Sequence, residues 1–269
     1  MRDDAVIDDA AVVARLRNAG CVFAADAAAL LVSAARTRQE LGALVERRAA
    51  GEPLEQVVGW AEFAGLRILV DPGVFVPRRR SEFLTSVAVG LAGWQTDGGG
   101  GIPVIVDLCC GTGALGLGVM SGLSGWAELH AADLDPAAVA CARRNVEPAG
   151  GHVYVSDLFG ALPGALRGRV NLLVCNAPYV PTGDVAFLPA EARDHEPLVA
   201  LDGGLDGLAI LRRAASEAPE WLAPDGVLLV ETSDRQAEEM VAAMAAAGLS
   251  PSIRTDEDWG ATVVTGQRS

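Results

Sequence analysis

From residue 102 onward, short apolar segments alternate with longer segments in which apolar residues recur at helical spacing. Strands are expected at 103–107, 128–132, 152–155, 170–175, 226–231 and 261–265. Helices are expected between them, at 113–122, 136–146, 205–222 and 235–247. Strands that alternate with helices in this way form βαβ units. The pattern therefore predicts an α/β fold with a mostly parallel, doubly wound sheet that is covered on both faces.

The first hundred residues are organised differently. Residues 1–50 are rich in alanine and carry apolar residues at helical spacing, which predicts a small bundle of about three helices. Residues 56–76 contain short apolar runs broken by glycines and by an Asp-Pro-Gly turn, and this pattern is typical of a β-hairpin. A helix is expected over 83–94, followed by a glycine-rich linker at 97–101. We expect three parts: a helical domain at 1–55, a hairpin, helix and linker at 56–101, and an α/β domain at 102–269.

Charge and cysteine content narrow the class of protein. The net charge is −14 and the pI is about 4.6, and most of the negative charge lies after residue 90. A protein that binds duplex nucleic acid usually has a basic surface and a high pI, so this acidic balance argues against such a partner. The acidic start lacks the positive charge of a secretory signal, and no apolar run reaches the roughly 18 residues of a membrane span. The 5 cysteines include no CxxC pair. We expect a cytoplasmic protein with no metal site and no contact with a membrane.

The first expected strand leads into a glycine-containing turn. The run Val106–Gly116 is an apolar strand that carries Asp107, then a turn with Gly111 and Gly113, then a helix. In an open α/β sheet, this first βα turn is where a nucleotide-like ligand binds, because glycine lets the ligand approach the backbone. An ordinary tight turn is the alternative interpretation.

Two further strands also end in an acidic residue. Asp133, followed by Leu134, closes the second expected strand, where a carboxylate can accept both hydroxyls of a ribose. Asp157, followed by Leu158, closes the third, where a carboxylate can accept from the exocyclic amine of adenine. Taken alone, such an acid is more often a helix cap or a surface residue. Three successive strands of this kind favour a nucleoside site.

The fourth strand ends in a segment suited to binding a planar amine. Asn176-Ala177-Pro178-Tyr179 places a side-chain amide, a rigid turn and an aromatic ring at the carboxyl edge of the sheet. The oxygen of Asn176 can accept from a planar NH2 group, on which the ring of Tyr179 can stack. Such a site can present an amide or an aniline-like nitrogen to an electrophile.

This segment resembles the Asn-Pro-Pro-Tyr signature of S-adenosylmethionine-dependent amino-methyltransferases, with Ala177 in place of the first proline. The order of strands and acids resembles the class I methyltransferase fold. A narrower family, the release-factor glutamine methyltransferases of the HemK type, is similar over nearly the whole chain. The segments that carry this resemblance, together with Glu231 and Gln236, are Arg47–Leu54, Val58–Gly65, Val76–Arg78 and Glu196–Leu208.

The resemblance implies an activity and a set of roles. That family methylates the side-chain nitrogen (N5) of the glutamine in the Gly-Gly-Gln motif of peptide chain release factors, and residues 1–55 would recognise the substrate. Asn176 would accept from the glutamine amide, Pro178 would shape the loop and Tyr179 would pack on the amide plane. The cofactor-binding set implied is Asp107, Cys109, Gly111, Thr112, Gly113, Asp133, Leu134, Asp157, Leu158 and Asn176. The substrate-binding set implied is Asn176, Ala177, Pro178, Tyr179, Glu196 and Pro197.

Departures from the family pattern leave alternatives open. The usual Pro-Arg-Pro-Glu-Thr-Glu linker reads Pro77–Glu82 with three consecutive arginines, Arg78 to Arg80, and Cys109 replaces a glycine. An amino-methyltransferase for adenine or guanine would use the same loop, although the net charge argues against it. An inactive cofactor-binding interaction module is a third possibility. A dehydrogenase fits the GxGxxG spacing of the first turn but lacks a candidate residue for its chemistry. We expect a monomer.

Overall fold

The computed structural model describes residues 9–96, 101–123 and 127–269, and it contains a central seven-stranded sheet of order β5-β4-β3-β6-β7-β9-β8. The strands β3 to β7 pair in parallel, whereas β9 runs antiparallel to both β7 and β8. The predicted mostly parallel α/β fold is therefore confirmed. The bounds of the strands are β3 Val104–Leu108, β4 Glu128–Asp133, β5 His152–Val155, β6 Val170–Cys175, β7 Leu222–Thr232, β8 Leu249–Asp256 and β9 Ala261–Arg268.

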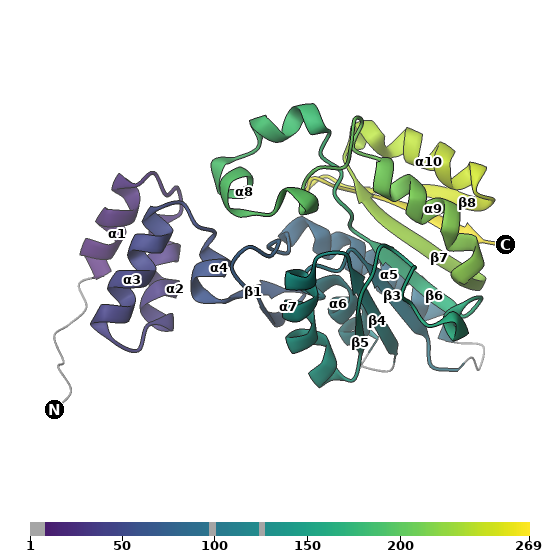
Figure 1. Ribbon diagram of the computed structural model, residues 1–269, viewed down its shortest axis with the longest axis horizontal. Coiled ribbons are helices and arrows are strands. Elements are labelled where there is room, and N and C mark those ends of the chain that lie inside the picture. Colours follow the sequence, from purple (N-terminus) through teal and green to yellow (C-terminus); the bar gives the residue numbers. More distant parts are fainter. Residues whose placement is uncertain (1–8, 97–100, 124–126) are drawn as a thin grey trace.

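Helices cover both faces of this sheet (Figure 1). Side chains along β3 alternate between two separate cores, with Val106 in one and Ile105 in the other, as a strand buried on both faces requires. The core on one face includes α9 (Ala209–Trp221) and α10 (Ala237–Ala246). The core on the other face includes α5 (Glu82–Thr96), α6 (Ala114–Gly122) and α7 (Pro136–Val146).

The N-terminal residues form the expected helical bundle at one end of the molecule (Figure 1). It contains α1 (Asp9–Asn18), α2 (Ala24–Ala34) and α3 (Arg38–Ala49), which share one apolar cluster with the short helix α4 (Leu54–Val58). The start of the chain and the glycine-rich part of the expected linker, 97–100, lie outside the described residues.

A hairpin joins the bundle to the sheet, as the glycine-broken apolar runs predict. The strands β1 (Trp60–Phe63) and β2 (Leu66–Leu69) pair antiparallel. Both atoms of the Asn145 amide bind the backbone of Leu69, at 2.9 Å each, so that α7 anchors the hairpin. A 3₁₀ turn, η1 (Arg79–Ser81), then leads into α5.

Two elements differ from the sequence expectations. Val57 and Val58 were expected in a strand but lie in α4, whose Val57 packs into the bundle. The strand β8 was not expected, because Pro251 and its polar neighbours give no apolar alternation. Since β8 is an edge strand that pairs only with β9, a proline is tolerated there.

The connections between the main elements include short helices. These are η2 (Glu147–Ala149), η3 (Gly164–Leu166), η4 (Thr182–Phe187), α8 (Ala190–His195), η5 (Leu198–Ala200) and η6 (Asp234–Gln236). The segment 182–200, which follows β6 and contains η4, α8 and η5, lies between the bundle and the α9 side of the sheet (Figure 1). Within the described ranges, no helix combines the length and apolar character needed to cross a membrane.

Candidate active site

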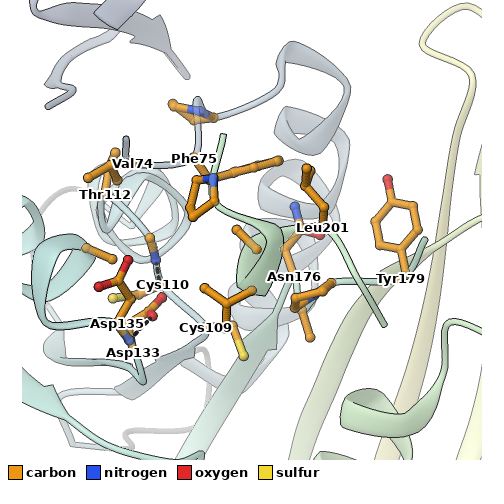
Figure 2. A pocket seen from close by; sticks show the side chains of 18 of the residues that line it. Val74, Phe75, Cys109, Cys110, Thr112, Asp133, Asp135, Asn176, Tyr179 and Leu201 are labelled. Carbon is orange, nitrogen blue, oxygen red and sulfur yellow. Dashed lines mark hydrogen bonds between the residues drawn. The ribbon is translucent and has the colours of Figure 1, made fainter. Parts of the chain in front are cut away.

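A cavity of about 520 Å³ opens at the carboxyl ends of the parallel strands. Figure 2 shows Thr112 and Asp133 toward one end of it and Asn176 and Tyr179 toward the other. A sheet of this kind binds its ligands at this edge. Of the residues predicted from the sequence, the cavity is lined by Cys109, Gly111, Thr112, Asp133, Leu134, Asp157, Leu158, Asn176, Ala177, Pro178, Tyr179 and Pro197.

The glycines of the first turn serve different purposes. Gly111 has a φ of +54°, and a Cβ added there would meet no atom within 4 Å, so its backbone is open to the cavity. Gly113 has a φ of +80°, and a Cβ there would lie 2.5 Å from Cγ2 of Val146 in α7. Gly111 therefore lets a ligand approach, whereas Gly113 lets two helices pack closely and does not line the cavity.

Asp107 is fully buried behind this turn and does not line the cavity. Its Oδ2 accepts from the backbone N–H of Gly116 at 2.8 Å, which holds the first turn of α6. Burial raises the pKa of Asp107 to about 7, although the bond from Gly116 opposes this. From this position Asp107 supports the turn.

Asp133 lines the cavity at the same end as Thr112 and is held by two backbone groups. Its carboxylate accepts from the backbone N–H of Gly111 at 2.8 Å and from that of Asp135 at 2.9 Å. Burial raises the pKa of this carboxyl group despite both bonds. The neighbouring Leu134 is 55% exposed and adds an apolar surface at the rim.

The end of β5 contributes one buried and one exposed residue. Leu158 is buried in the left-handed conformation, with φ +49°, and its carbonyl accepts from the hydroxyl of Ser156 at 2.7 Å. Asp157 is exposed and forms an ion pair with Arg213 of α9 at 2.9 Å. A ligand that hydrogen-bonds Asp157 would therefore share that carboxylate with an arginine.

Cys109 lines the cavity in the left-handed conformation, with φ +54°. A hydrogen bond with Cys175, together with burial, raises the pKa of the Cys109 thiol well above its usual range. The thiol is therefore neutral and weakly nucleophilic at physiological pH. Cys109 shapes the cavity wall rather than forming a covalent bond.

Asn176 directly follows β6 and is held from outside the sheet. Its Nδ2 donates to the hydroxyl of Ser81, at the start of α5, over 3.1 Å. Its Oδ1 has no hydrogen-bond partner among the described residues, so it remains available as an acceptor at the cavity. Ala177 and Pro178, next along the chain, are buried.

The backbone after Asn176 is held by a glycine-rich segment. The carbonyl of Tyr179 accepts from Nε2 of Gln236 at 2.8 Å. A Cβ on Gly203 would lie 2.5 Å from the carbonyl oxygen of Pro178, and one on Gly207 would lie 2.2 Å from that of Tyr179. The sequence pattern around these glycines indicated only a family resemblance, whereas the structure shows that they allow close backbone packing here.

The phenol of Tyr179 belongs to a charged cluster. It donates to Oε1 of the buried Glu231 at 2.9 Å, and it accepts from Nη2 of Arg80. Nε of Arg80 also reaches Oε1 of Glu231, at 3.2 Å. Burial, followed by the charge of Glu231, raises the pKa of Tyr179 above its usual range, so the phenol keeps its proton.

Glu196 is buried but does not line the cavity, unlike its neighbour Pro197. Its carboxylate accepts from the backbone N–H of Val76 at 3.2 Å and pairs with Arg78. Burial raises the pKa of Glu196, which the charge of Arg78 opposes. Glu196 therefore connects the segment after α8 to the linker. In addition, Arg48 of α3 forms an ion pair with Glu191 of α8 at 2.9 Å, which connects the helical bundle to the same region.

Sequence reasoning weighed Arg80 only as a partner contact or a solvated linker residue and Glu231 only as part of the resemblance, and it connected neither of them, nor Ser81, to Asn176. Two of them precede Asn176 by more than ninety residues, and nothing in their local pattern marks them as its neighbours. Among the described residues, no group of three or more histidine, cysteine, aspartate or glutamate side chains is arranged to hold a metal ion.

Comparisons with known proteins agree with this geometry. Residues 99–190 match the methyltransferase small domain family. The release factor glutamine methyltransferase of Bifidobacterium longum is 37% identical over 228 residues, which cover 81% of this chain and 76% of that protein. A 4-amino-L-phenylalanine/4-methylamino-L-phenylalanine methyltransferase of Streptomyces pristinaespiralis is 36% identical over 204 residues, covering 76% and 69% of the two chains.

Solved structures agree on the fold. A 16S rRNA N2 methyltransferase of T. thermophilus, determined with AdoMet and guanosine, superposes with a TM-score of 0.54 at 20% identity, over 78% of this chain and 50% of that one. At this identity the likeness shows the class I methyltransferase fold alone. The identity with the curated relatives extends over most of the chain, and on that ground the protein belongs to the release factor glutamine methyltransferase family.

Proposed function

We propose that this protein transfers a methyl group from S-adenosylmethionine to the side-chain amide nitrogen (N5) of a protein glutamine, in the Gly-Gly-Gln motif of a peptide chain release factor. The observation that carries the proposal is the environment of Asn176. Its amide is fixed through Nδ2, and its oxygen remains free at the cavity. The names of the curated relatives support the substrate.

The cofactor end of the cavity fits S-adenosylmethionine. The open backbone at Gly111 leaves room for the methionine part, which Cys109 and Thr112 would flank. The carboxylate of Asp133 is oriented by two backbone N–H groups and can accept from the ribose hydroxyls. Leu134, Asp157 and Leu158 would surround the adenine. S-adenosylmethionine, when bound, supplies a methyl group already activated by a sulfonium.

The acceptor end needs to align a weak nucleophile, because the lone pair of an amide nitrogen is delocalised. Oδ1 of Asn176 would accept one N–H of the glutamine amide, and a backbone carbonyl of the Ala177–Pro178 turn would accept the other. Both bonds strengthen as positive charge develops on the nitrogen, and alignment alone can lower the barrier by several kcal/mol. Tyr179 would pack on the amide plane, with its phenol neutral.

The remaining parts of the chain fit a protein substrate. We propose that residues 1–55 recognise it, because the bundle reaches the cavity rim through the ion pair of Arg48 with Glu191, which lines the cavity. Pro197 would contact the substrate, and Glu196 would hold that segment in place. The protein would act as a monomer in the cytoplasm, where its 5 free cysteines would stay reduced.

A small aromatic amine is the second candidate acceptor. One relative is named for 4-amino-L-phenylalanine, whose aniline nitrogen is also planar, and Ala177 departs from the expected double proline. The same Asn176 oxygen could accept from either kind of NH2 group. The acceptor must therefore be tested directly.

The test measures the transfer of labelled methyl from S-adenosylmethionine to purified release factors. One control factor carries Gly-Gly-Glu in place of Gly-Gly-Gln, and a separate reaction contains 4-amino-L-phenylalanine. We expect label in the wild-type factor and none in the control. Label only in the small amine would replace the proposed substrate by the second candidate. Binding of S-adenosylmethionine with no transfer to any acceptor would contradict the proposed activity and favour an interaction module.

A further inference from the structure

The two side chains that would contact the methyl acceptor are both held by one turn outside the sheet. Ser81 accepts from Nδ2 of Asn176 at 3.1 Å, and the guanidinium of Arg80 donates to the phenol of Tyr179. Ser81 is 2% exposed, whereas the side chain of Arg80 is 47% exposed. Both residues line the cavity, at the point where η1 meets α5.

The register of the sheet explains why this turn meets the acceptor end. Cys175 of β6 pairs with Val230 of β7, so Asn176 and Glu231 are neighbours at adjacent strand ends. Val174 and Leu229, two residues earlier on each strand, belong to the core that α5 covers. Because strand side chains alternate, Asn176 and Glu231 also project toward the α5 face, where the turn before α5 brings Ser81 and Arg80.

Each contact restricts a different motion. Without Ser81, the amide of Asn176 could rotate about χ2 and present Nδ2 instead of Oδ1 to the acceptor, which would place two donors against each other. Without Arg80, the phenol of Tyr179 keeps only its bond to Oε1 of Glu231. Arg80 also reaches that same oxygen through its Nε at 3.2 Å, so it fixes both the phenol and the carboxylate that accepts from it.

We propose that Ser81 and Arg80 are positioning residues of the acceptor site, Ser81 through the amide of Asn176 and Arg80 through the phenol of Tyr179. This inference rests on the proposed function for its kinetic consequences. It assigns to the linker, rather than to the Asn-Ala-Pro-Tyr segment alone, the control of how the acceptor nitrogen is aligned.

Ser81→Ala tests the first contact. We expect kcat for methyl transfer to fall about tenfold to a hundredfold, with the KM for S-adenosylmethionine within twofold, because a buried hydrogen bond to the amide is lost. Ser81→Thr keeps the hydroxyl and should restore most of the rate. Thr85→Val is the matched control: Thr85 lies four residues further along, in the first turns of α5, it is buried, and its hydroxyl has no partner among the described residues. An unchanged kcat in Ser81→Ala would overturn the role of Ser81.

A double-mutant cycle tests the second contact. Arg80→Gln should lower kcat about tenfold in the wild-type background and less than twofold in a Tyr179→Phe background, because its effect passes through the phenol. Arg79→Gln is the control, since Arg79 is exposed, stacks on Trp259 and does not line the cavity. Equal losses in both backgrounds would overturn the role of Arg80.

An NMR measurement keeps this inference separate from the proposed function. The side-chain NH2 signals of Asn176, recorded on the ¹⁵N-labelled protein with S-adenosylhomocysteine, should shift in Ser81→Ala and remain unchanged in Thr85→Val. Unchanged signals in Ser81→Ala would refute the contact even where methyl transfer is observed. Shifted signals in a protein that methylates no release factor would support the contact while contradicting the proposed substrate.

Discussion

Replacing Gly207 by alanine tests whether the segment with Gly203 and Gly207 holds the loop Asn176–Tyr179, the proposed acceptor site. Gly207 has a φ of +79°, and a left-handed conformation costs an alanine roughly 1–2 kcal/mol. Its Cβ would lie 2.2 Å from the carbonyl oxygen of Tyr179 and 2.4 Å from Nε2 of Gln236. Gln236 would then lose its bonds to the carbonyls of Tyr179 and Asp206, which contribute about 1 kcal/mol each.

These terms predict that Gly207→Ala lowers the free energy of unfolding by about 3–4 kcal/mol, a large share of the roughly 5–15 kcal/mol of an ordinary domain. Gly150→Ala provides the matched control, because Gly150 has a φ of +87° and a Cβ there would meet nothing within 4 Å. It should lose about 1–2 kcal/mol only. Urea unfolding monitored by circular dichroism measures both variants.

Measuring the rate of methyl transfer distinguishes an effect on the loop Asn176–Tyr179 from a general loss of stability. Gly207→Ala should lower kcat at a temperature at which the variant is fully folded, because Tyr179 must shift, whereas Gly150→Ala should keep wild-type kcat. Equal losses of unfolding free energy in the two variants, with kcat unchanged in both, would refute the argument that close packing at Gly207 aligns the loop.

Three further predictions follow from the site. Asn176→Ala should abolish methyl transfer while calorimetry shows the wild-type affinity for S-adenosylmethionine; near-wild-type turnover would contradict the role of Asn176. Burial raises the pKa of Asp107 to about 7 from the usual value near 4, so the folded state binds this proton more tightly than the unfolded state does. The free energy of unfolding of the wild type should therefore fall by up to about 1.4 kcal/mol per pH unit as the pH rises from about 4 to about 7. Asp107→Asn should remove this part of the slope, and identical pH profiles of unfolding would show that Asp107 does not titrate there. Gly113→Ala should weaken binding of S-adenosylmethionine, because the added Cβ clashes with Val146. The double variant with Val146→Ala should regain most of the affinity. A lack of recovery would mean that the backbone angle at Gly113, rather than the clash, causes the loss of affinity.

The sheet could be predicted because burial leaves a periodic pattern. The strands β3 to β7 are apolar segments bounded by turns, and the acids at the ends of β4 and β5 stand where the topology places a ligand. The edge strand β8 lacks that pattern because most of its residues are exposed, and its pairing with β9 is set by the backbone. The helix α4 was mistaken for strand because five residues are too few to show a helical period.

The candidate site could be predicted where its residues lie at the carboxyl ends of the parallel strands. Gly111 and Asp133 lie at the ends of successive strands, and their hydrogen bond follows from the topology. Spacing could not distinguish Gly111, which lines the cavity, from Gly113, which packs against α7. The contact of Ser81 with Asn176 depends on how α5 crosses the sheet, and no local pattern encodes that crossing.

The two ends of the cavity differ in how much of the chain they require. The end that includes Asp133 is built mainly from residues 109–158, whereas the other end needs Ser81, Asn176 and Glu231 together. Because a ribosome delivers the chain from its N-terminus, the acceptor end cannot be assembled until β7 has left the exit tunnel. The proposed methyl transfer therefore becomes possible only late in synthesis.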